Sequence, residues 1–495
     1  MPNVATILSN SAAKYPDAPA ILLDDIVLSY AALDGLSAKV AGLLASRGVK
    51  AGDRVALVSP NIPQMPALYY GILRFGAVVV PLNPLLKARE VEYHLQNSEA
   101  SLVFAWEGIL DQVQPAAEAV GIPVVPVDAA LLPLLAEITA IPEIAPVKES
   151  DTAVILYTSG TTGRPKGAEL THSNLLSNAS VSRDLFETGP GDVLFGGLPF
   201  FHIFGQTCAL NAAMLAGAAV TLLPKFDPVK ALEIVQRDKV TIFMGVPTMH
   251  IAVLRVPNKQ DYDLSSLKVG VSGGAPLPLE VLREYEASFG VTMLEGYGLS
   301  ETSPVVSFNQ LDGVRKPGSI GTPVRGAQMR VSDDAGHEVP RGEVGEIAVA
   351  GPYVMKGYWR NPEATESAIR DGWFYTGDLG TEDEDGVFFV VDRKKDMILR
   401  GGYNVYPREV EEVLYEHPAV AEAAVKGRPD EVHGEEIIAV VSLKPGVEDN
   451  GELAEEIRDY VKERIAAYKY PREVRIVEEL PKGPTGKILK REIEV

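Results

Sequence analysis

A loop rich in glycine and hydroxyl side chains carries the clearest chemistry in the sequence. It runs from Tyr157 to Gly167, follows the apolar stretch 153–156 and contains Lys166. Backbone N–H groups and hydroxyls in such a loop can surround phosphate oxygens, and the lysine adds positive charge. It is not a P-loop, because Pro165 precedes the lysine and Gly167 follows it. Taken alone, the same composition also fits a solvated, flexible loop.

Further short motifs follow this loop along the chain. They are Gly296-Tyr-Gly-Leu-Ser-Glu301-Thr302, Tyr375-Thr-Gly-Asp378-Leu, Asp392-Arg393-Lys-Lys395-Asp, Gly401-Gly402-Tyr403-Asn-Val-Tyr-Pro-Arg-Glu-Val-Glu and Pro481-Lys-Gly-Pro-Thr-Gly-Lys487-Ile-Leu. Together with the loop they resemble the adenylate-forming superfamily, which includes acyl-CoA synthetases, 4-coumarate ligases, firefly luciferase and the adenylation domains of peptide synthetases. The resemblance covers essentially the whole chain. It implies an ATP-dependent enzyme that joins a carboxylic acid to AMP.

The resemblance implies an ATP site built from several of these motifs. Tyr297 would stack on the adenine, and Gly273 and Gly274 would form the opposite wall, since glycine lets a base approach the backbone. Asp378 would accept hydrogen bonds from the ribose hydroxyls, with Arg393 beside it. The positions that match nucleotide-binding residues of the family are Thr158, Ser159, Gly160, Thr161, Thr162, Gly163, Lys166, Gly273, Gly274, Ala275, Gly296, Tyr297, Gly298, Ser300, Thr302, Asp378, Arg393 and Lys487.

The resemblance also implies the groups that act in the first step. A substrate carboxylate would attack the α-phosphate of ATP and displace pyrophosphate, a transfer that gains most from positioning and from nearby cations. Lys487 matches the lysine that reaches both the α-phosphate and the carboxylate, and His202 matches the residue that closes the carboxylate site. Lys166 and Thr158 complete the expected catalytic set. Glu301, with Thr158, would hold Mg²⁺, a hard cation that favours oxygen ligands.

Acyl transfer to coenzyme A would need a second arrangement of the chain. In the family the small C-terminal domain turns about a hinge, which Lys395 matches, and withdraws the catalytic lysine. Gly401, Gly402 and Tyr403 would then face the large domain, and the glycines would leave room for the pantetheine arm. Such a motion suits two half-reactions that need different groups in one water-poor site.

The expected acid is a medium- or long-chain fatty acid. The candidate lining positions carried over from the family are predominantly apolar and comprise Phe201, His202, Phe204, Gly205, Met244, Val246, Met249, Gly298, Ser303, Pro304 and Val305. No Arg or Lys stands among them to bind a second carboxylate, which disfavours malonate-like acids. A cinnamate or benzoate is the alternative, because Phe204 can stack on a ring as readily as it packs a chain.

Other functions stay open from the sequence. An amine could capture the adenylate in place of coenzyme A, although the Gly401-Gly402-Tyr403 segment argues against such an amide ligase. The intact charged residues of the motifs weigh against a non-catalytic acyl-binding protein. The run Gly270-Val-Ser272-Gly-Gly274 fits the Gly-x-Ser-x-Gly pattern of serine hydrolases. The prolines that follow it delay the next helix to about Leu279, which spoils the sharp turn that a nucleophilic serine needs.

Short apolar runs alternate with amphipathic stretches over most of the chain, as in 54–59, 64–75 and 77–82. This alternation is typical of β-α-β units and predicts an α/β protein with parallel sheets covered by helices. Short strands and turns over 326–389 indicate a β-rich subdomain. The last hundred or so residues predict a compact α+β domain, with helices at about 407–417 and 453–468. We therefore expect a large N-terminal domain over 1–392, a hinge at 393–396 and a small mobile domain over 397–495.

Composition excludes several other classes of protein. The formal net charge of −21 over 495 residues disfavours a nucleic-acid surface. Cys208 is the single cysteine, so no internal disulfide forms, and with no secretory leader at the amino terminus a cytoplasmic location is expected. The uncharged stretch 193–223 is interrupted by Pro199 and several glycines, which favours a buried strand, loop and helix over a membrane span. The sequence does not determine whether the chain forms a homodimer.

Overall fold

Two mostly parallel sheets form the body of the protein. The computed structural model describes residues 2–158 and 164–495. The strands of the first sheet, from edge to edge, are β15 (Thr322–Pro323), β14 (Val305–Phe308), β13 (Thr292–Gly298), β12 (Val269–Ser272), β11 (Ile242–Gly245), β9 (Val193–Gly196), β10 (Ala219–Leu222), β1 (Pro19–Leu23) and β2 (Ile26–Ser29). All neighbours from β13 to β1 pair in parallel, and the edge strands pair antiparallel.

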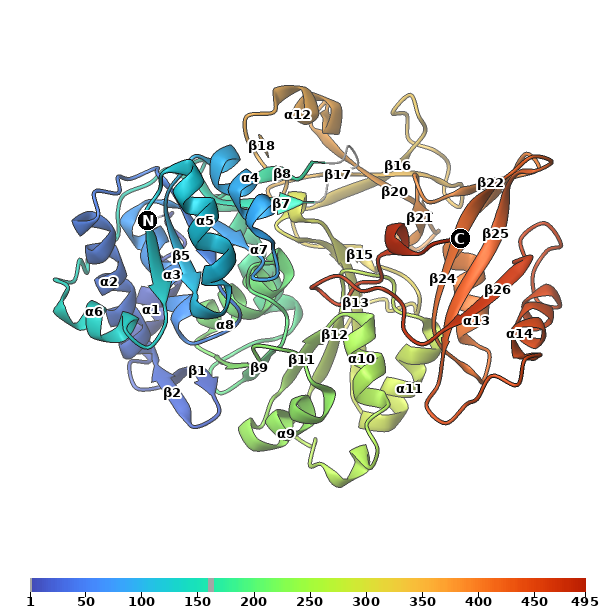
Figure 1. Ribbon diagram of the computed structural model, residues 1–495, viewed down its shortest axis with the longest axis horizontal. Helices are drawn as coiled ribbons and strands as arrows, with labels where there is room; N and C mark the ends of the chain where they lie inside the picture. Colours follow the sequence, from blue (N-terminus) through green and yellow to red (C-terminus); the bar gives the residue numbers. More distant parts are fainter. Residues whose placement is uncertain (1, 159–163) are drawn as a thin grey trace.

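The second sheet lies beside the first (Figure 1). Its strands, from edge to edge, are β18 (Gly357–Tyr358), β8 (Lys166–Thr171), β7 (Thr152–Thr158), β4 (Val78–Leu82), β3 (Arg54–Val58), β5 (Ala100–Trp106) and β6 (Val124–Val127). The run of buried aliphatic residues in β4 is typical of a parallel strand covered on both faces. One continuous hydrophobic core contains residues from both sheets. The prediction of an α/β fold with parallel sheets is confirmed.

Helices surround the two sheets (Figure 1). They are α1 (Thr6–Lys14), α2 (Tyr30–Ser46), α3 (Gln64–Phe75), α4 (Ala88–Ser98), α5 (Leu110–Val120), α6 (Leu131–Glu137), α7 (His172–Leu185), α8 (Ala212–Ala216), α9 (Pro228–Asp238), α10 (Pro247–Leu254) and α11 (Leu279–Phe289). A π-helix over Phe204–Asn211 precedes α8, so the uncharged stretch 193–223 forms strand, loop and buried helix as expected. Within the described residues, no helix combines the length and apolar character that crossing a bilayer requires.

A third sheet and a fourth sheet follow along the chain. The third contains β16 (Gln328–Ser332), β17 (Gly345–Ala350), β20 (Trp373–Glu382), β19 (Ile369–Arg370) and β21 (Phe388–Arg393), with α12 (Pro362–Ala368). The fourth contains β23 (Tyr403–Val405), β22 (Ile398–Arg400), β25 (Gly434–Leu443), β24 (Val420–Asp430) and β26 (Glu473–Val477), with α13 (Pro407–Tyr415) and α14 (Leu453–Lys462). The chain passes between these sheets at 394–397. We propose the domain boundary there, with residues 1–392 as the large domain and 397–495 as the small domain.

The helix expected over 453–468 is shorter than predicted. It ends at Lys462, and the chain turns before it enters β26. Tyr468 lies beyond the helix and stacks its ring on Tyr403, with the ring centroids 4.7 Å apart. Pro471 follows three residues after Tyr468 and disfavours helical backbone at Tyr470, well beyond Lys462, so the amphipathic pattern alone overestimated the length.

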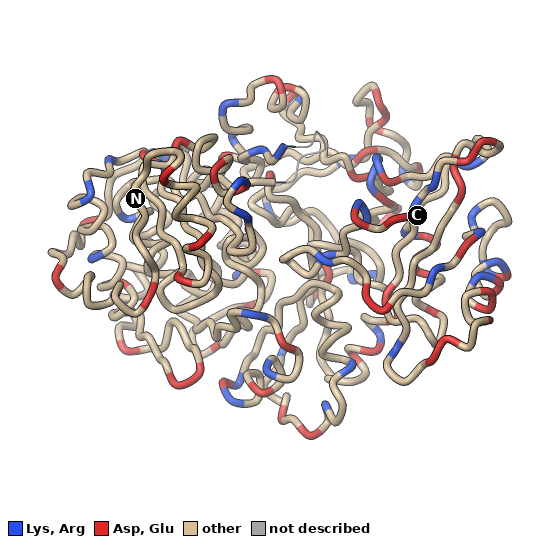
Figure 2. Tube along the Cα trace, in the orientation of Figure 1, with Lys and Arg blue, Asp and Glu red and all other residues tan. Residues whose placement is uncertain are grey.

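Charged residues of both signs are interspersed along the chain (Figure 2). With a net charge of −21, an anionic substrate depends on the few basic side chains placed near it. The small domain lies at one end of the molecule, and its last segment extends toward the large domain (Figure 1). That segment contains Lys487, one of the predicted catalytic residues.

Candidate active site

The glycine-rich loop joins two strands that pair with each other. β7 ends at Thr158 and β8 begins at Lys166, and these residues are directly opposite in the antiparallel pair. The strand ladder therefore fixes both side chains where the loop begins and ends. The other residues predicted in the loop, Ser159, Gly160, Thr161, Thr162 and Gly163, lie outside the described residues.

Glu301 lies beside the start of this loop. Its Oε1 accepts a hydrogen bond of 2.8 Å from the Tyr358 hydroxyl and one of 3.4 Å from the Thr158 hydroxyl. The Lys166 ammonium lies 5.3 Å from the centroid of the Tyr358 ring. A buried carboxylate next to a hydroxyl fits a Mg²⁺ ion, which needs few protein ligands when nucleotide oxygens supply the others.

Tyr297, Asp378 and Arg393 form a connected group at the junction of β13 with the third sheet. The Tyr297 hydroxyl donates to Asp378 Oδ2 at 2.6 Å, and Arg393 Nε lies 3.5 Å from Asp378 Oδ1. Asp378 and Arg393 are partners in the β20–β21 pair. Burial and the Asp378 carboxylate raise the pKa of Tyr297 well above its usual value, so the phenol stays protonated as a donor. The group brings the predicted adenine and ribose residues together.

The glycines around Tyr297 have a packing role. A Cβ on Gly296 would lie 2.0 Å from the Phe308 ring, and a Cβ on Gly298 would lie 1.9 Å from the Pro304 carbonyl oxygen. Glycine is therefore required at both positions by the neighbouring strand, whatever binds there. β13 continues through both of them.

The predicted wall of Gly273, Gly274 and Ala275 follows directly after β12. Gly274 has a φ of +80°, and Ala275 is half-buried. A Cβ on Gly273 would lie 3.2 Å from the Phe204 ring, so the wall lies against the first residue of the π-helix. The candidate nucleotide wall and the candidate acyl pocket therefore share a boundary at Phe204.

Lys487 and His202 come together although they are far apart in the sequence. Burial, and then the charge of Arg393, lower the pKa of Lys487 to about 8, while Asp378 acts in the opposite direction. Burial, and then the charge of Lys487, lower the pKa of His202 to about 4. His202 Nδ1 accepts a hydrogen bond from the Phe204 amide at 3.3 Å. The neutral ring therefore carries its proton on Nε2, where it can serve as a donor.

The predicted pocket residues are mostly buried around the π-helix and the start of α10. Phe204, Val246, Met249, Pro304 and Val305 are buried, and Phe201 is half-buried. Met244 lies within β11 and is fully buried. A Cβ on Gly205 would lie 2.5 Å from the Pro199 carbonyl oxygen, so this glycine packs backbone against backbone.

Two of the predicted contacts need correction. The Thr302 hydroxyl donates to the carbonyl oxygens of Pro304 at 2.5 Å and Leu299 at 3.1 Å, and its side chain is fully buried, so it is not available to a phosphate. The Ser303 hydroxyl donates to the Tyr353 carbonyl at 2.8 Å and does not line the pocket. Both hydroxyls stabilise the turn after the short helix Ser300–Thr302. Ser300 remains half-buried at its start.

Comparisons with known proteins agree with this geometry. Residues 8–359 match the family described as AMP-binding enzyme, and residues 409–487 match the AMP-binding enzyme C-terminal domain.

The chain belongs to the family of AMP-binding enzymes.

Similar proteins carry different acyl specificities in their names. A long-chain-fatty-acid–CoA ligase of Bacillus subtilis is 40% identical, over 100% of this chain and 94% of that protein. A feruloyl-CoA synthase of Amycolatopsis is also 40% identical, over 97% of this chain and 96% of that protein. The crystal structure of ATP-bound MatB from Rhodopseudomonas palustris superposes with a TM-score of 0.91 at 36% identity, over 99% of this chain and 97% of that chain.

Another predicted segment of this AMP-binding enzyme is an exposed turn of the small domain. Gly401 and Gly402 form the turn between β22 and β23, with φ of +59° and +84°. A Cβ on Gly402 would meet no described atom within 4 Å, and Tyr403 is 58% exposed. Lys395 is exposed in the turn between the third and fourth sheets. The structure therefore brings the predicted nucleotide residues Tyr297, Asp378 and Arg393 near Lys487, and the predicted coenzyme A segment is an exposed turn.

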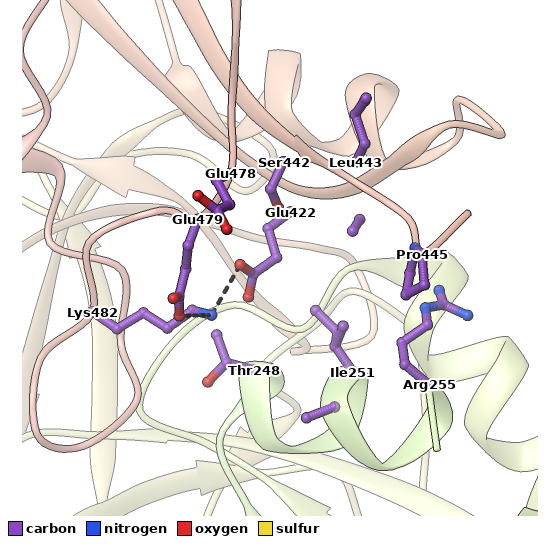
Figure 3. Close-up of a pocket in the computed structure, with 12 residues that line it drawn as sticks. Thr248, Ile251, Arg255, Glu422, Ser442, Leu443, Pro445, Glu478, Glu479 and Lys482 are labelled. Atoms are coloured by element: carbon purple, nitrogen blue, oxygen red, sulfur yellow. Dashed lines mark hydrogen bonds and ion pairs between the residues drawn. The ribbon is translucent and has the colours of Figure 1, made fainter. Parts of the chain in front are cut away.

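A groove of about 780 Å³ separates the large and small domains of the AMP-binding enzyme near Lys487 (Figure 3). One wall is α10, with Thr248 and Ile251, and the other contains Glu422 and Lys482 of the small domain. Lys482 Nζ lies 3.0 Å from Glu422 Oε2 and 3.3 Å from Glu479 Oε1. These ion pairs hold the beginning of the Lys487 loop against the small domain.

Sequence reasoning missed two side chains that contact the site. Tyr358 donates to Glu301, and Thr248 donates to the Gly486 carbonyl oxygen at 2.7 Å. Tyr358 lies on a strand of two residues, which is too short to give an alternating pattern. Thr248 directly follows Pro247, which marks the helix start but says nothing about a partner 238 residues away.

Proposed function

We propose that the chain, an ATP-dependent acyl-CoA ligase, activates a medium- or long-chain fatty acid. The apolar lining of the candidate pocket supports this choice, since Phe204, Val246, Met249 and Val305 are each less than 9% exposed. Transfer of a methylene group from water to such surroundings is worth about 0.8 kcal/mol, so each additional carbon that fits strengthens binding. A second carboxylate would meet no cation among these residues and would be disfavoured.

In the proposed first half-reaction, an oxygen of the acid attacks the α-phosphorus of ATP. The bond between the α-phosphorus and the bridging oxygen breaks, and pyrophosphate leaves with the bonding electrons. With a pKa of about 8, Lys487 is mostly charged at pH 7 and can stabilise the negative charge on the α-phosphate oxygens and the carboxylate. Neutral His202 can donate from Nε2 and orient the carboxylate without withdrawing its nucleophilic electrons.

The remaining groups would position the nucleotide. Asp378 would accept from the ribose hydroxyls, with Arg393 beside it, and Lys166 would neutralise phosphate charge at the end of β8. Glu301 and Thr158 would hold Mg²⁺, which when bound supplies further positive charge at the phosphates. Positioning of this kind contributes through proximity rather than through covalent chemistry.

In the proposed second half-reaction, the thiol of coenzyme A attacks the carbonyl carbon of the acyl-adenylate. The carbon–sulfur bond forms, the carbon–oxygen bond to AMP breaks, and the thiol proton is released. We propose that the small domain turns about residues 393–396, so that Lys487 leaves and Gly401, Gly402 and Tyr403 approach the large domain. The open space around Gly402 supports this, because a Cβ there would meet no described atom within 4 Å and the turn is free to contact the large domain after such a rotation.

An aromatic acid is the second candidate substrate. Phe204 lies against Gly273 at the edge of the candidate pocket, and its ring could stack on an aromatic acid as readily as it packs an alkyl chain. A cinnamate or benzoate would then bind where the first carbons of a fatty acid would bind. The similarity to both named groups of ligases gives each substrate class support.

Pyrophosphate release with a panel of acids tests the proposal. The panel contains fatty acids from hexanoate to octadecanoate, cinnamates, benzoates and malonate, each with ATP and magnesium, with and without coenzyme A. We expect thioester formation, detected by mass, with kcat/KM highest for a fatty acid of eight or more carbons. A higher kcat/KM for cinnamate or benzoate would favour the aromatic alternative. Adenylate formed without transfer to coenzyme A, but captured by an added amine, would contradict the acyl-CoA ligase.

A further inference from the structure

A single hydroxyl of the large domain holds the backbone next to Lys487. Thr248 Oγ1 donates to the Gly486 carbonyl oxygen at 2.7 Å. Thr248 lies in the first turn of α10, on the wall of the interdomain groove, and the small domain forms the facing wall (Figure 3). The hydrogen bond therefore crosses the proposed domain boundary and ends one residue before the lysine.

The loop fits closely against this part of the large domain. A Cβ on Gly486 would lie 2.9 Å from Thr248 Oγ1 and 3.0 Å from Val246 Cγ2, and its φ of +78° suits glycine. Val246 contacts the nucleotide wall as well, since its Cγ1 lies 3.5 Å from the Cβ position of Gly274. Gly486 therefore packs against Val246, which also borders the candidate site.

The loop 483–487 is closed by hydrogen bonds between its own backbone groups. The Gly483 amide donates to the Lys487 carbonyl at 2.7 Å, and the Gly486 amide donates to the Gly483 carbonyl at 2.8 Å. Lys482, at its start, pairs with the mostly buried Glu422. A loop closed by its own hydrogen bonds cannot shift Gly486 without shifting Lys487.

We propose that Thr248 is a positioning residue for adenylation alone. This inference rests on the proposed function, in which Lys487 acts in the first half-reaction and withdraws before the second. The Thr248–Gly486 hydrogen bond exists only while the loop is docked, so it stabilises the adenylating arrangement and not the thioester-forming one. Its loss lowers the occupancy and precision of the docked lysine, and leaves acyl transfer unchanged.

The test compares Thr248→Val with the wild-type chain in separate half-reactions. Acyl-adenylate formation is measured in a single turnover with ATP, magnesium and the best acid, without coenzyme A. Loss of one net hydrogen bond predicts a rate lower by about fivefold. Acyl transfer is measured with supplied acyl-adenylate and coenzyme A, and is expected to match the wild-type rate. Thr248→Ser keeps the hydroxyl and is expected to restore adenylation to within about twofold.

Controls separate docking from stability. Thr139→Val makes the same substitution at an exposed threonine of the large domain and is expected to leave both rates unchanged. The melting temperature of each variant is measured, and if Thr248→Val fails to fold, Thr248→Ala carries the same comparison. Equal losses in both half-reactions, or full adenylation by Thr248→Val, would overturn the inference while leaving the proposed function standing. A wild-type chain that forms no acyl-adenylate would overturn both.

Discussion

Two segments of the small domain carry glycines next to a predicted functional residue, and their surroundings differ sharply. At Gly486 an added Cβ would crowd Thr248 and Val246 of the large domain, and the next residue, Lys487, lies near His202. At Gly402 an added Cβ would meet no described atom within 4 Å, and the next residue, Tyr403, is 58% exposed. Contact with the large domain and a positive φ both favour glycine at 486, whereas at 402 only the φ of +84° does. The difference supports the proposal that Lys487 is docked for adenylation in this arrangement.

Of the changes that test this comparison, removal of the docked lysine is expected to lower the adenylation rate most. Lys487→Ala deletes the cation that faces the α-phosphate and the carboxylate, and loss of one such stabilising group costs about 10²- to 10³-fold in rate. Pyrophosphate release in a single turnover measures the effect. Lys462→Ala, which removes an exposed lysine of the small domain, serves as the control for loss of charge. A Lys487→Ala rate within threefold of wild type would show that the docked segment does not act in adenylation.

The segments of Lys487 and Gly402 are also distinguished by the pH dependence of the two half-reactions. The pKa of Lys487 is lowered to about 8, so its charged form is lost as pH rises through 8, whereas an ordinary lysine stays charged to about 10.5. Adenylation is expected to fall by about tenfold per pH unit well above 8, and acyl transfer from supplied acyl-adenylate is not expected to fall with it. In Lys487→Arg the falling limb should disappear, because arginine stays charged throughout. An alkaline limb that persists in this variant would assign the titration to another group.

Substitution of the exposed turn is expected to act on the other half-reaction. Gly402→Ala places a Cβ in a left-handed backbone conformation and in space that acyl transfer is proposed to use, so thioester formation should fall by about fivefold to tenfold. Adenylation should stay within twofold of wild type. Gly446→Ala is the matched control, because Gly446 has the same φ of +84° and equally open surroundings in the small domain. A Gly402→Ala variant with normal acyl transfer would remove this turn from the proposed second arrangement.

The smallest expected effect on the adenylation rate comes from a change beside Glu301, the residue proposed to hold Mg²⁺. Tyr358→Phe removes the hydrogen bond of 2.8 Å to Glu301 and is expected to lower adenylation about threefold. The magnesium concentration for half-maximal rate should rise, while the KM for the acid should not change. Tyr460→Phe, at a half-buried tyrosine of the small domain, is the control. An unchanged magnesium dependence would show that Tyr358 does not position Glu301 for the metal.

The sequence predicted which residues lie together better than it predicted their individual contacts. Ordered motifs placed Lys487, His202 and Asp378 among the functional residues, and the structure brings each of them to the same region. Thr302 could not be judged from its motif, because its hydroxyl is used by carbonyl groups of its own turn. Thr248 could not be found at all, since a hydrogen bond to a backbone carbonyl leaves no mark on the identity of the residue that accepts it.

The same limit applies to the fold. Alternating apolar and amphipathic segments predicted parallel sheets because each segment is buried in its own layer. The end of α14 at Lys462 and the pairing of β18 with β8 depend on distant parts of the chain, so local patterns did not reveal them. The substrate class could not be predicted from the sequence for a similar reason. Apolar lining fits both an alkyl chain and a ring, and the residue types do not distinguish the shapes.

The central claim is that Lys487 serves the first half-reaction and is absent from the second. Acyl transfer by Lys487→Ala tests it most directly, with chemically prepared acyl-adenylate and coenzyme A supplied to a variant that cannot form the adenylate itself. The account predicts thioester formation at the wild-type rate. Acyl transfer reduced as severely as adenylation would contradict it, because the lysine would then be needed in both arrangements.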